Sequence, residues 1–282
     1  MHDAIVVPKD QNGFVMRLND SGGHTKLHWH EELEFNLIVS GSAYYVIGSK
    51  RYLLTEGTLI WLFPRQEHLL VDYGDSFCMW VVVFTQPVRD VLATHPEREA
   101  WLAPDPGRVL LRRLATRDFD RLDELSRIVH GTTGDGDRFN LGISFLAAEG
   151  WNAFLHGEAL EAGSDLSPMV VGALRIISRK GGCAALPEVA AELNATVGWL
   201  GRSFHRELGV TFTRYCQRIK LMRFTCLRKE HPASSLTQLA YRAGFGSYAQ
   251  FHRVYSSAYG ASPSKADAPG QEQRSAALGA TA

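Results

Sequence analysis

The sequence predicts a chain of two parts, a β-rich barrel or sandwich first and an all-α part second. Short apolar runs separated by turn residues fill residues 22–84, whereas apolar residues recur at helical spacing from about residue 122. Charge divides in the same way. Residues 1–165 hold 15 Lys and Arg against 24 Asp and Glu, a net charge of −9, and residues 166–265 hold 14 against 4, a net charge of +10. A basic half inside a neutral chain of 282 residues indicates a polyanionic partner, most often nucleic acid.

The strands of the β-rich part are expected between about Gly22 and Phe84. A Gly48-Ser49 turn signal lies between two apolar runs and predicts a hairpin. Many short strands with turns between them are typical of a sandwich or barrel. The expected strands are residues 33–39, 43–47, 52–54, 59–63 and 79–84.

A helical middle segment follows the strands. Leu122, Leu125, Ile128 and Val129 lie at helical spacing, glycine-rich residues 131–136 break the chain, and a second stripe runs through residues 138–156. This block is either a helix pair that packs within the chain or a dimer interface, and the sequence leaves both open. Residues 158–167 are typical of a linker, and the tail from Ala266 onward is expected to be disordered. The second stripe consists of Phe139, Ile143, Leu146 and Phe154.

Two segments of the basic half repeat one pattern, residues 186–209 and residues 236–260. In the first, a short helix starts near Pro187, a tight turn follows at residues 194–196, and Thr196 caps a second helix. In the second, residues 244–246 make the turn and Ser247 is the cap. Each second helix carries an arginine two residues before an inward aromatic side chain. The inward residues are Leu200 and Phe204 in the first unit and Phe251 and Tyr255 in the second, and the arginines are Arg202 and Arg253.

A long helix is expected between the two units, over residues 211–229, stopped before Pro232. A helix of about 19 residues is roughly 28 Å long. It would hold two reading helices about one DNA turn apart, on the order of 34 Å. Its apolar stripe consists of Phe212, Tyr215, Ile219, Met222 and Cys226.

These residues resemble the AraC/XylS family of bacterial regulators over residues 169–264. The most specific stretches are VAAEL…LGRSFHRELGVTFTRY and LAYRAGFGSYAQFHR…YGASPS. The resemblance implies two helix-turn-helix units whose second helices enter the major groove of promoter DNA. Gly198 and Gly201 depart from the family pattern because glycine brings no side chain to a base edge. The candidate DNA-binding residues are Trp199, Arg202, Arg206, Ser247, Tyr248, His252 and Arg253.

In the acidic half, residues 22–41 read GGHTKLHWHEELEFNLIVSG and fit the pattern G-x5-H-x-H-x3-E-x6-G. On a strand His28 and His30 point to one face. Glu34 points to the same face because it lies an even number of residues from both. His68 offers a further imidazole. The pattern resembles the cupin superfamily and the sensing domain of many AraC-type regulators.

Three interpretations of this cluster stay open: a site for a divalent metal such as Zn, Fe, Mn or Ni, a metal-free effector site, and a hydrogen-bonded structural cluster. No cofactor is therefore certain. The candidate metal ligands are His28, His30, Glu34 and His68, and the candidate effector-binding residues are these four with Tyr44 and Trp61.

The combined expectation is a sequence-specific DNA-binding transcription regulator, not an enzyme, whose cupin-like domain senses a small effector. The alternative is a metal-dependent cupin dioxygenase or isomerase with an appended DNA-binding domain. Expected partners are promoter DNA, the effector, RNA polymerase and a second copy of the chain. The expected domains are residues 1–90 (sensing), 91–165 (helical extension and linker), 166–265 (DNA binding) and 266–282 (disordered tail).

The cysteines and apolar runs indicate where the protein works. Cys78, Cys183, Cys216 and Cys226 show no C-x-x-C spacing and no disulfide framework, as is typical of a reducing cytoplasm. The first thirty residues lack a signal-type apolar core, and the longest apolar run, residues 78–84, is too short to span a bilayer. We therefore expect a cytoplasmic protein with no membrane contact.

Overall fold

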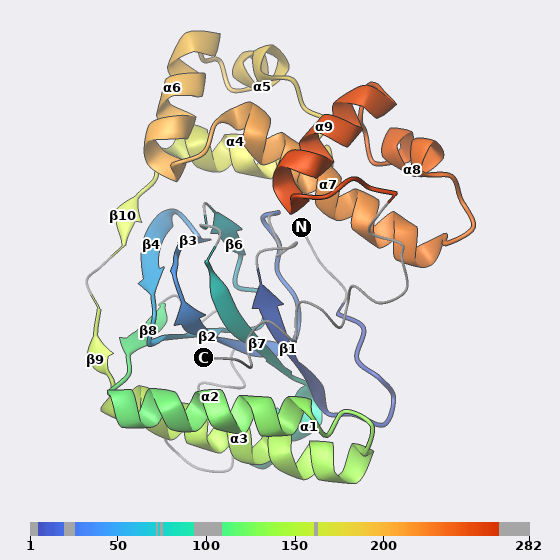
Figure 1. Cartoon of the computed structure of the whole chain (residues 1–282). Coiled ribbons are helices and arrows are strands. Elements are labelled where there is room, and N and C mark those ends of the chain that lie inside the picture. Colours follow the sequence, from blue (N-terminus) through green and yellow to red (C-terminus); the bar gives the residue numbers. More distant parts are fainter. Residues whose placement is uncertain are drawn as a thin grey trace.

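The computed structural model describes residues 5–19, 26–71, 73, 76–92, 109–160 and 163–264. It has a β-rich N-terminal part and a helical C-terminal part, as predicted (Figure 1). Gly22 of the histidine pattern and the tail expected to be disordered lie outside the described residues. Within the described part of the chain, no helix combines the length and the apolar character needed to cross a membrane.

The N-terminal part contains two antiparallel sheets that face each other in a cupin-like barrel. The larger has the strand order β1-β7-β2-β5-β8-β9 and the smaller the order β10-β4-β3-β6. Apolar side chains of both sheets meet between them, among them Ile38 and Val81 of the larger sheet and Leu70 of the smaller. The strands are β1 (Gly13–Asn19), β2 (Leu33–Ser40), β3 (Ser42–Ile47), β4 (Lys50–Thr55), β5 (Thr58–Leu62), β6 (His68–Val71), β7 (Cys78–Phe84), β8 (Leu110–Arg113), β9 (Glu158–Ala159) and β10 (Ser164–Asp165).

Two long helices, α2 (Thr116–His130) and α3 (Gly136–His156), cover the outer face of the larger sheet (Figure 1). Their buried stripes agree with the predicted periodicity, except that Ile128 is exposed. A short helix, α1 (Gln86–Leu92), precedes them. The sheet therefore buries both faces, one against the opposite sheet and one against this helix pair.

Five strands were not predicted. β1 lies before Gly22, where the prediction began, and pairs along its full length with β7. β6 follows a tight turn in which Arg65 has a φ of 64°, and β8, β9 and β10 have four residues or fewer. These strands depend on pairing with partners distant in the sequence, which local periodicity does not reveal.

The C-terminal part is helical throughout and contains the two predicted units, α5–α6 and α8–α9, joined by α7. Thr196 and Ser247 cap the second helices, accepting hydrogen bonds from the backbone N–H of Trp199 at 3.3 Å and of Gln250 at 3.1 Å. In the second turn Gly244 has a φ of 99°, and a Cβ there would lie 2.3 Å from Sγ of Cys183. The helices are α4 (Pro168–Arg179), α5 (Leu186–Glu192), α6 (Val197–Leu208), α7 (Phe212–Glu230), α8 (Leu236–Arg242) and α9 (Tyr248–Tyr259).

The predicted stripe of α7 is correct in its first half and wrong in its second. Ile219 is buried against the first unit, but the residues that bury the second half are Leu221 and Phe224, which pack against α8 and α9. The stripe shifts because the helix serves two separate cores in succession. Met222 and Cys226 are thereby turned away from both cores and toward the barrel.

Candidate functional site

The second helix of the first unit, α6, exposes one polar face. Trp199, Arg202 and Arg206 are exposed and follow a spacing of three and four residues, which places them on one side of the helix. Arg202 lies beside Gly198, since a Cβ at Gly198 would be 3.3 Å from Nη1 of Arg202. Gly201 instead faces α5, where a Cβ would lie 3.3 Å from Leu186. The two glycines therefore make room for a guanidinium group and for a neighbouring helix.

The second helix of the second unit, α9, exposes His252 and Arg253. Tyr248 is partly buried, with its ring 5.7 Å from that of Phe251 and 6.2 Å from that of His252. Ser247 holds the helix end through one lone pair of its hydroxyl oxygen, and its O–H can still donate to a ligand. Arg202 and Arg253 thus occupy equivalent exposed places in the two units.

The N-terminal part gathers three buried histidines in the barrel. One ring nitrogen from each of His28, His30 and His68 lies within 4.8 Å of the others. His28 precedes β2 and His68 begins β6, and the two residues form an isolated antiparallel bridge. The predicted meeting of these histidines is therefore present in the fold.

The three imidazoles share one hydrogen-bond arrangement. In each ring Nδ1 faces a backbone carbonyl oxygen two residues away in the sequence. The distances are 2.8 Å from His28 to Lys26, 3.1 Å from His30 to Glu32 and 2.9 Å from His68 to Gln66. A carbonyl oxygen only accepts, so each Nδ1 carries the proton and each Nε2 presents its lone pair when the ring is neutral. This arrangement is the one that orients metal-binding histidines in proteins.

Glu34 lies beside the cluster and belongs to a second network. Its carboxylate lies 3.2 Å from Nε2 of His30 and accepts a hydrogen bond from Asn36 at 2.8 Å, and Asn36 also donates to the hydroxyl of Tyr45 at 3.0 Å. Glu34 is not among the residues whose ligand atoms converge. The ligand atoms that converge are therefore those of the three histidines, and Glu34, the fourth predicted ligand, lies beside them.

The same contacts set the ionisation of the network. Burial raises the pKa of Glu34, but the hydrogen bond and charge of His30 outweigh burial and lower it to about 2. Burial lowers the pKa of His30, yet its contact with Glu34 raises it above its usual value. Burial and the neighbouring His28 hold the pKa of His68 well below its usual range. Glu34 is therefore ionised and His68 neutral.

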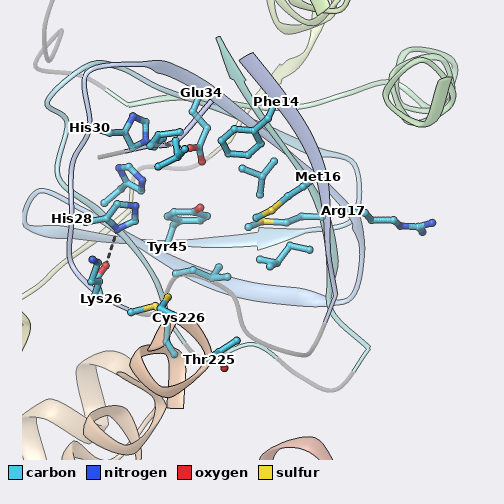
Figure 2. A pocket seen from close by; sticks show the side chains of 18 of the residues that line it. Phe14, Met16, Arg17, Lys26, His28, His30, Glu34, Tyr45, Thr225 and Cys226 are labelled. Carbon is cyan, nitrogen blue, oxygen red and sulfur yellow. Dashed lines mark hydrogen bonds and ion pairs between the residues drawn. The ribbon is translucent and has the colours of Figure 1, made fainter. Parts of the chain in front are cut away.

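A cavity of about 520 Å³ opens beside the histidines (Figure 2). Glu34, Tyr45 and the histidines point into it, and apolar side chains such as Phe14 and Met16 line its far side. Helix α7 closes one side of it with Met222, Thr225, Cys226 and Lys229. Its volume lies within the usual range for a small-molecule site, and both parts of the chain contribute to its wall.

Two predicted effector residues, Tyr44 and Trp61, do not line this cavity. Trp61 is fully buried on the outer face of the larger sheet, with its ring 5.6 Å from that of Trp151 on α3. Tyr44 lies outside the barrel with the guanidinium of Arg51 4.3 Å from its ring. Alternation along β3 and β5 turns both outward, and the same alternation brings Tyr45 inward, a signal that was present in the sequence.

Two family models match the chain. An AraC-like ligand binding domain matches residues 14–81, and a helix-turn-helix domain matches residues 189–268.

The chain is 22% identical over 254 residues to an uncharacterized HTH-type transcriptional regulator YdeC of Bacillus subtilis, covering 86% of this chain and 85% of that protein. It is 23% identical over 261 residues to the HTH-type transcriptional activator RhaS of Escherichia coli O139:H28, covering 84% and 85%. Among solved structures, ToxT from Vibrio cholerae O395 aligns with a TM-score of 0.37 and 17% identity, covering 92% of this chain and 97% of that one.

Proposed function

Because the chain belongs to the AraC/XylS family of transcription regulators, with a ligand-binding N-terminal domain and a helix-turn-helix DNA-binding domain, we propose that α6 and α9 enter the major groove of its promoter DNA. The observation that supports this assignment is the repeat: each unit exposes an arginine two residues before a buried aromatic side chain. Arginine reads guanine because its fork matches O6 and N7. The proposed DNA-contacting residues, called the reading set below, are Trp199, Arg202, Arg206, Ser247, Tyr248, His252 and Arg253.

The test is selection of bound sequences from a random DNA library by the full chain, followed by Arg253→Ala. We expect the substitution to weaken binding to the selected site by about 1–3 kcal/mol and to relax the preference at one base pair. Arg117→Ala, at an exposed arginine of α2, is the matched control and should bind like the wild type. Unchanged affinity and preference in Arg253→Ala would remove that side chain from the reading set.

For the barrel, we propose that His28, His30 and His68 hold a divalent transition metal and that the effector binds in the adjoining cavity. Three histidine ligands with a fourth position left for another molecule are a common zinc arrangement. The three Nδ1–carbonyl contacts support this proposal, because they fix the ring orientation that ligation needs. The metal would supply a Lewis acid, and Glu34 and Tyr45 would offer polar contacts to the effector.

The metal site is tested by elemental analysis of the purified protein and by titration of the metal-stripped protein with Zn²⁺. We expect about one metal ion per chain and a loss of at least tenfold in affinity in His68→Ala, since one of three ligands is removed. His156→Ala, at an exposed histidine that ends α3, is the control. A chain that binds no metal and still responds to its effector would leave the metal-free interpretation standing.

The remaining partners follow from surfaces outside these sites. We propose that the outward face of α2 and α3 joins two copies of the chain, because this face exposes large apolar side chains. We further propose contact with RNA polymerase when the protein is bound at a promoter, and work in the cytoplasm, where the DNA is. The exposed apolar residues of this face are Ile128, Leu141, Phe145 and Leu155.

We also propose a division of labour along the chain: residues 1–90 sense the effector, residues 91–165 connect and dimerise, and residues 166–265 bind DNA. The curated relatives are transcription regulators, and we infer that this chain is likewise no enzyme. The feature that favours a metal-dependent cupin enzyme is the three-histidine cluster. Turnover by the metal-loaded chain with candidate oxidation or isomerisation substrates would support that alternative.

A further inference from the structure

Two residues of the barrel that contact the DNA-binding helices are sequence neighbours of the cluster histidines. Leu27 precedes His28, and Glu67 precedes His68. The backbone N–H of each histidine donates to the carbonyl oxygen of the other, at 3.1 and 2.9 Å. Because neighbouring side chains in extended backbone point to opposite sides, the histidines face the cavity while Leu27 and Glu67 face away from it.

On that opposite side lies the first helix-turn-helix unit with α4. Leu27 is 1% exposed and packs within the hydrophobic cluster of α4, α5 and α6. Its backbone N–H donates to Oγ of Ser178 on α4 at 3.1 Å, in a buried position. Glu67 pairs with Arg175 of the same helix at 2.8 Å. Leu69, one residue beyond His68, joins the same cluster. The barrel thus completes the core of the first unit.

The segment that carries Leu27 is joined to the start of β6 by an antiparallel β-bridge. Within the described residues, His28 makes a single bridge pair, whereas β1 pairs with β7 over seven residues. The carbonyl oxygen of His30 accepts one further hydrogen bond, from Arg65 at 2.7 Å. Side-chain ligation at His28 and His30 would add two restraints to this short segment, one at its bridge residue and one two residues further along.

We propose that metal binding by His28, His30 and His68 fixes Leu27 and Glu67 in place and so docks the first helix-turn-helix unit onto the barrel. This inference rests on the metal site proposed above and adds its regulatory consequence. Metal occupancy then sets how freely α6 moves relative to the barrel. By linkage, docking raises metal affinity by the same factor by which metal favours docking.

The test loosens the interface from the α4 side, where no metal ligand is touched. The full chain carrying Ser178→Ala and Arg175→Ala loses the acceptor for the Leu27 N–H and the ion pair with Glu67. We expect its Zn²⁺ affinity, measured by competition with a chromophoric chelator, to fall at least fivefold, the lower end of typical coupling factors. Arg179→Ala is the matched control, because Arg179 is exposed on the same helix but pairs with Glu192 of α5. It should leave Zn²⁺ affinity unchanged.

A second measurement follows docking directly in the wild type. Zn²⁺ should slow hydrogen exchange in the peptide that contains residues 168–179, and should do so less in Arg175→Ala, a surface change that leaves the fold intact. The coupling is wrong if the wild type and the double variant bind Zn²⁺ with equal affinity, or if Zn²⁺ does not change the rate of hydrogen exchange in α4. Either result leaves the metal site standing. Absence of Zn²⁺ binding by the wild type overturns the metal site, and the coupling with it.

Discussion

Trp61, which the sequence predicts as an effector contact, is a core side chain. It lies in β5 next to Ile60, which faces the barrel interior, while Trp61 faces α3. The helix comes so close that a Cβ at Gly150 would lie 3.3 Å from the indole. A ligand inside the barrel therefore has no path to this ring, and its contribution is to stability.

Trp61→Ala should lower the free energy of unfolding by about 3–5 kcal/mol, because it removes a fully buried indole and leaves a cavity. Tyr44→Ala should cost far less, since Tyr44 is only half-buried and loses mainly its contact with Arg51. Urea unfolding followed by circular dichroism measures both. A loss below about 1 kcal/mol for Trp61→Ala would contradict this assignment.

Among the elements, α2 and α3 form an antiparallel pair with two unlike faces. The inner face carries Phe139, Ile143 and Leu146 against the sheet. The outer face leaves Leu141 76% and Phe145 50% exposed, four residues apart on α3. Such a patch is suited to a twofold contact in which the same surface meets itself. Of the two interpretations that the sequence left open, internal packing is present at the inner face, and the dimer interface is our proposal for the outer face.

Phe145→Glu should convert a dimer to a monomer, because it places a charge at the centre of the proposed apolar contact. Sedimentation velocity at micromolar concentration measures the change. Thr133→Glu adds the same charge in the exposed turn between the helices and should leave the dimer intact. A wild type that sediments as a monomer at these concentrations would refute the dimer outright.

The elements that the sequence predicted well are those specified locally. The starts of α6 and α9 are predictable because the hydroxyl oxygens of Thr196 and Ser247 each accept a hydrogen bond from the backbone N–H three residues later. β1 and β6 escaped prediction because their stability comes from partner strands. The convergence of His28, His30 and His68 was predictable from strand alternation and the cupin-like pattern.

The part of the site that α7 provides was not predictable in the same way. Met222 and Cys226 continue an apolar stripe in the sequence, and only the shift between two cores turns them toward the cavity. Likewise Leu27 shows no signal of its role, because its partner Ser178 lies 151 residues away along the chain. Contacts between domains depend on their docking, which no local pattern encodes.

At the scale of the whole molecule, charge is separated rather than absent. The net charge of −9 over residues 1–165 and +10 over residues 166–265 gives a neutral chain with one basic end. A basic region of this kind meets the phosphate backbone of DNA, while the acidic half avoids it. The structure adds that the two halves meet through α4, which packs on a few barrel residues, and through α7, which closes one side of the cavity.

This charge separation predicts a steep salt dependence of DNA binding by the full chain. Each phosphate neutralised contributes a slope of about −0.9 in a plot of log affinity against log salt concentration. Arg206 lies at the end of α6, where it bonds Ser203 and Glu207, and we propose that it meets a phosphate rather than a base. Arg206→Ala should therefore flatten the slope by about 0.9 and weaken all sequences alike.

Arg253→Ala should instead lower affinity for the selected site while it retains most of the slope, because a base contact depends on geometry more than on released counterions. Fluorescence anisotropy over a salt series with selected and scrambled DNA separates the two effects. The reverse pattern, with Arg206 setting the preference and Arg253 the slope, would exchange their roles and place the dominant sequence reading in the first unit.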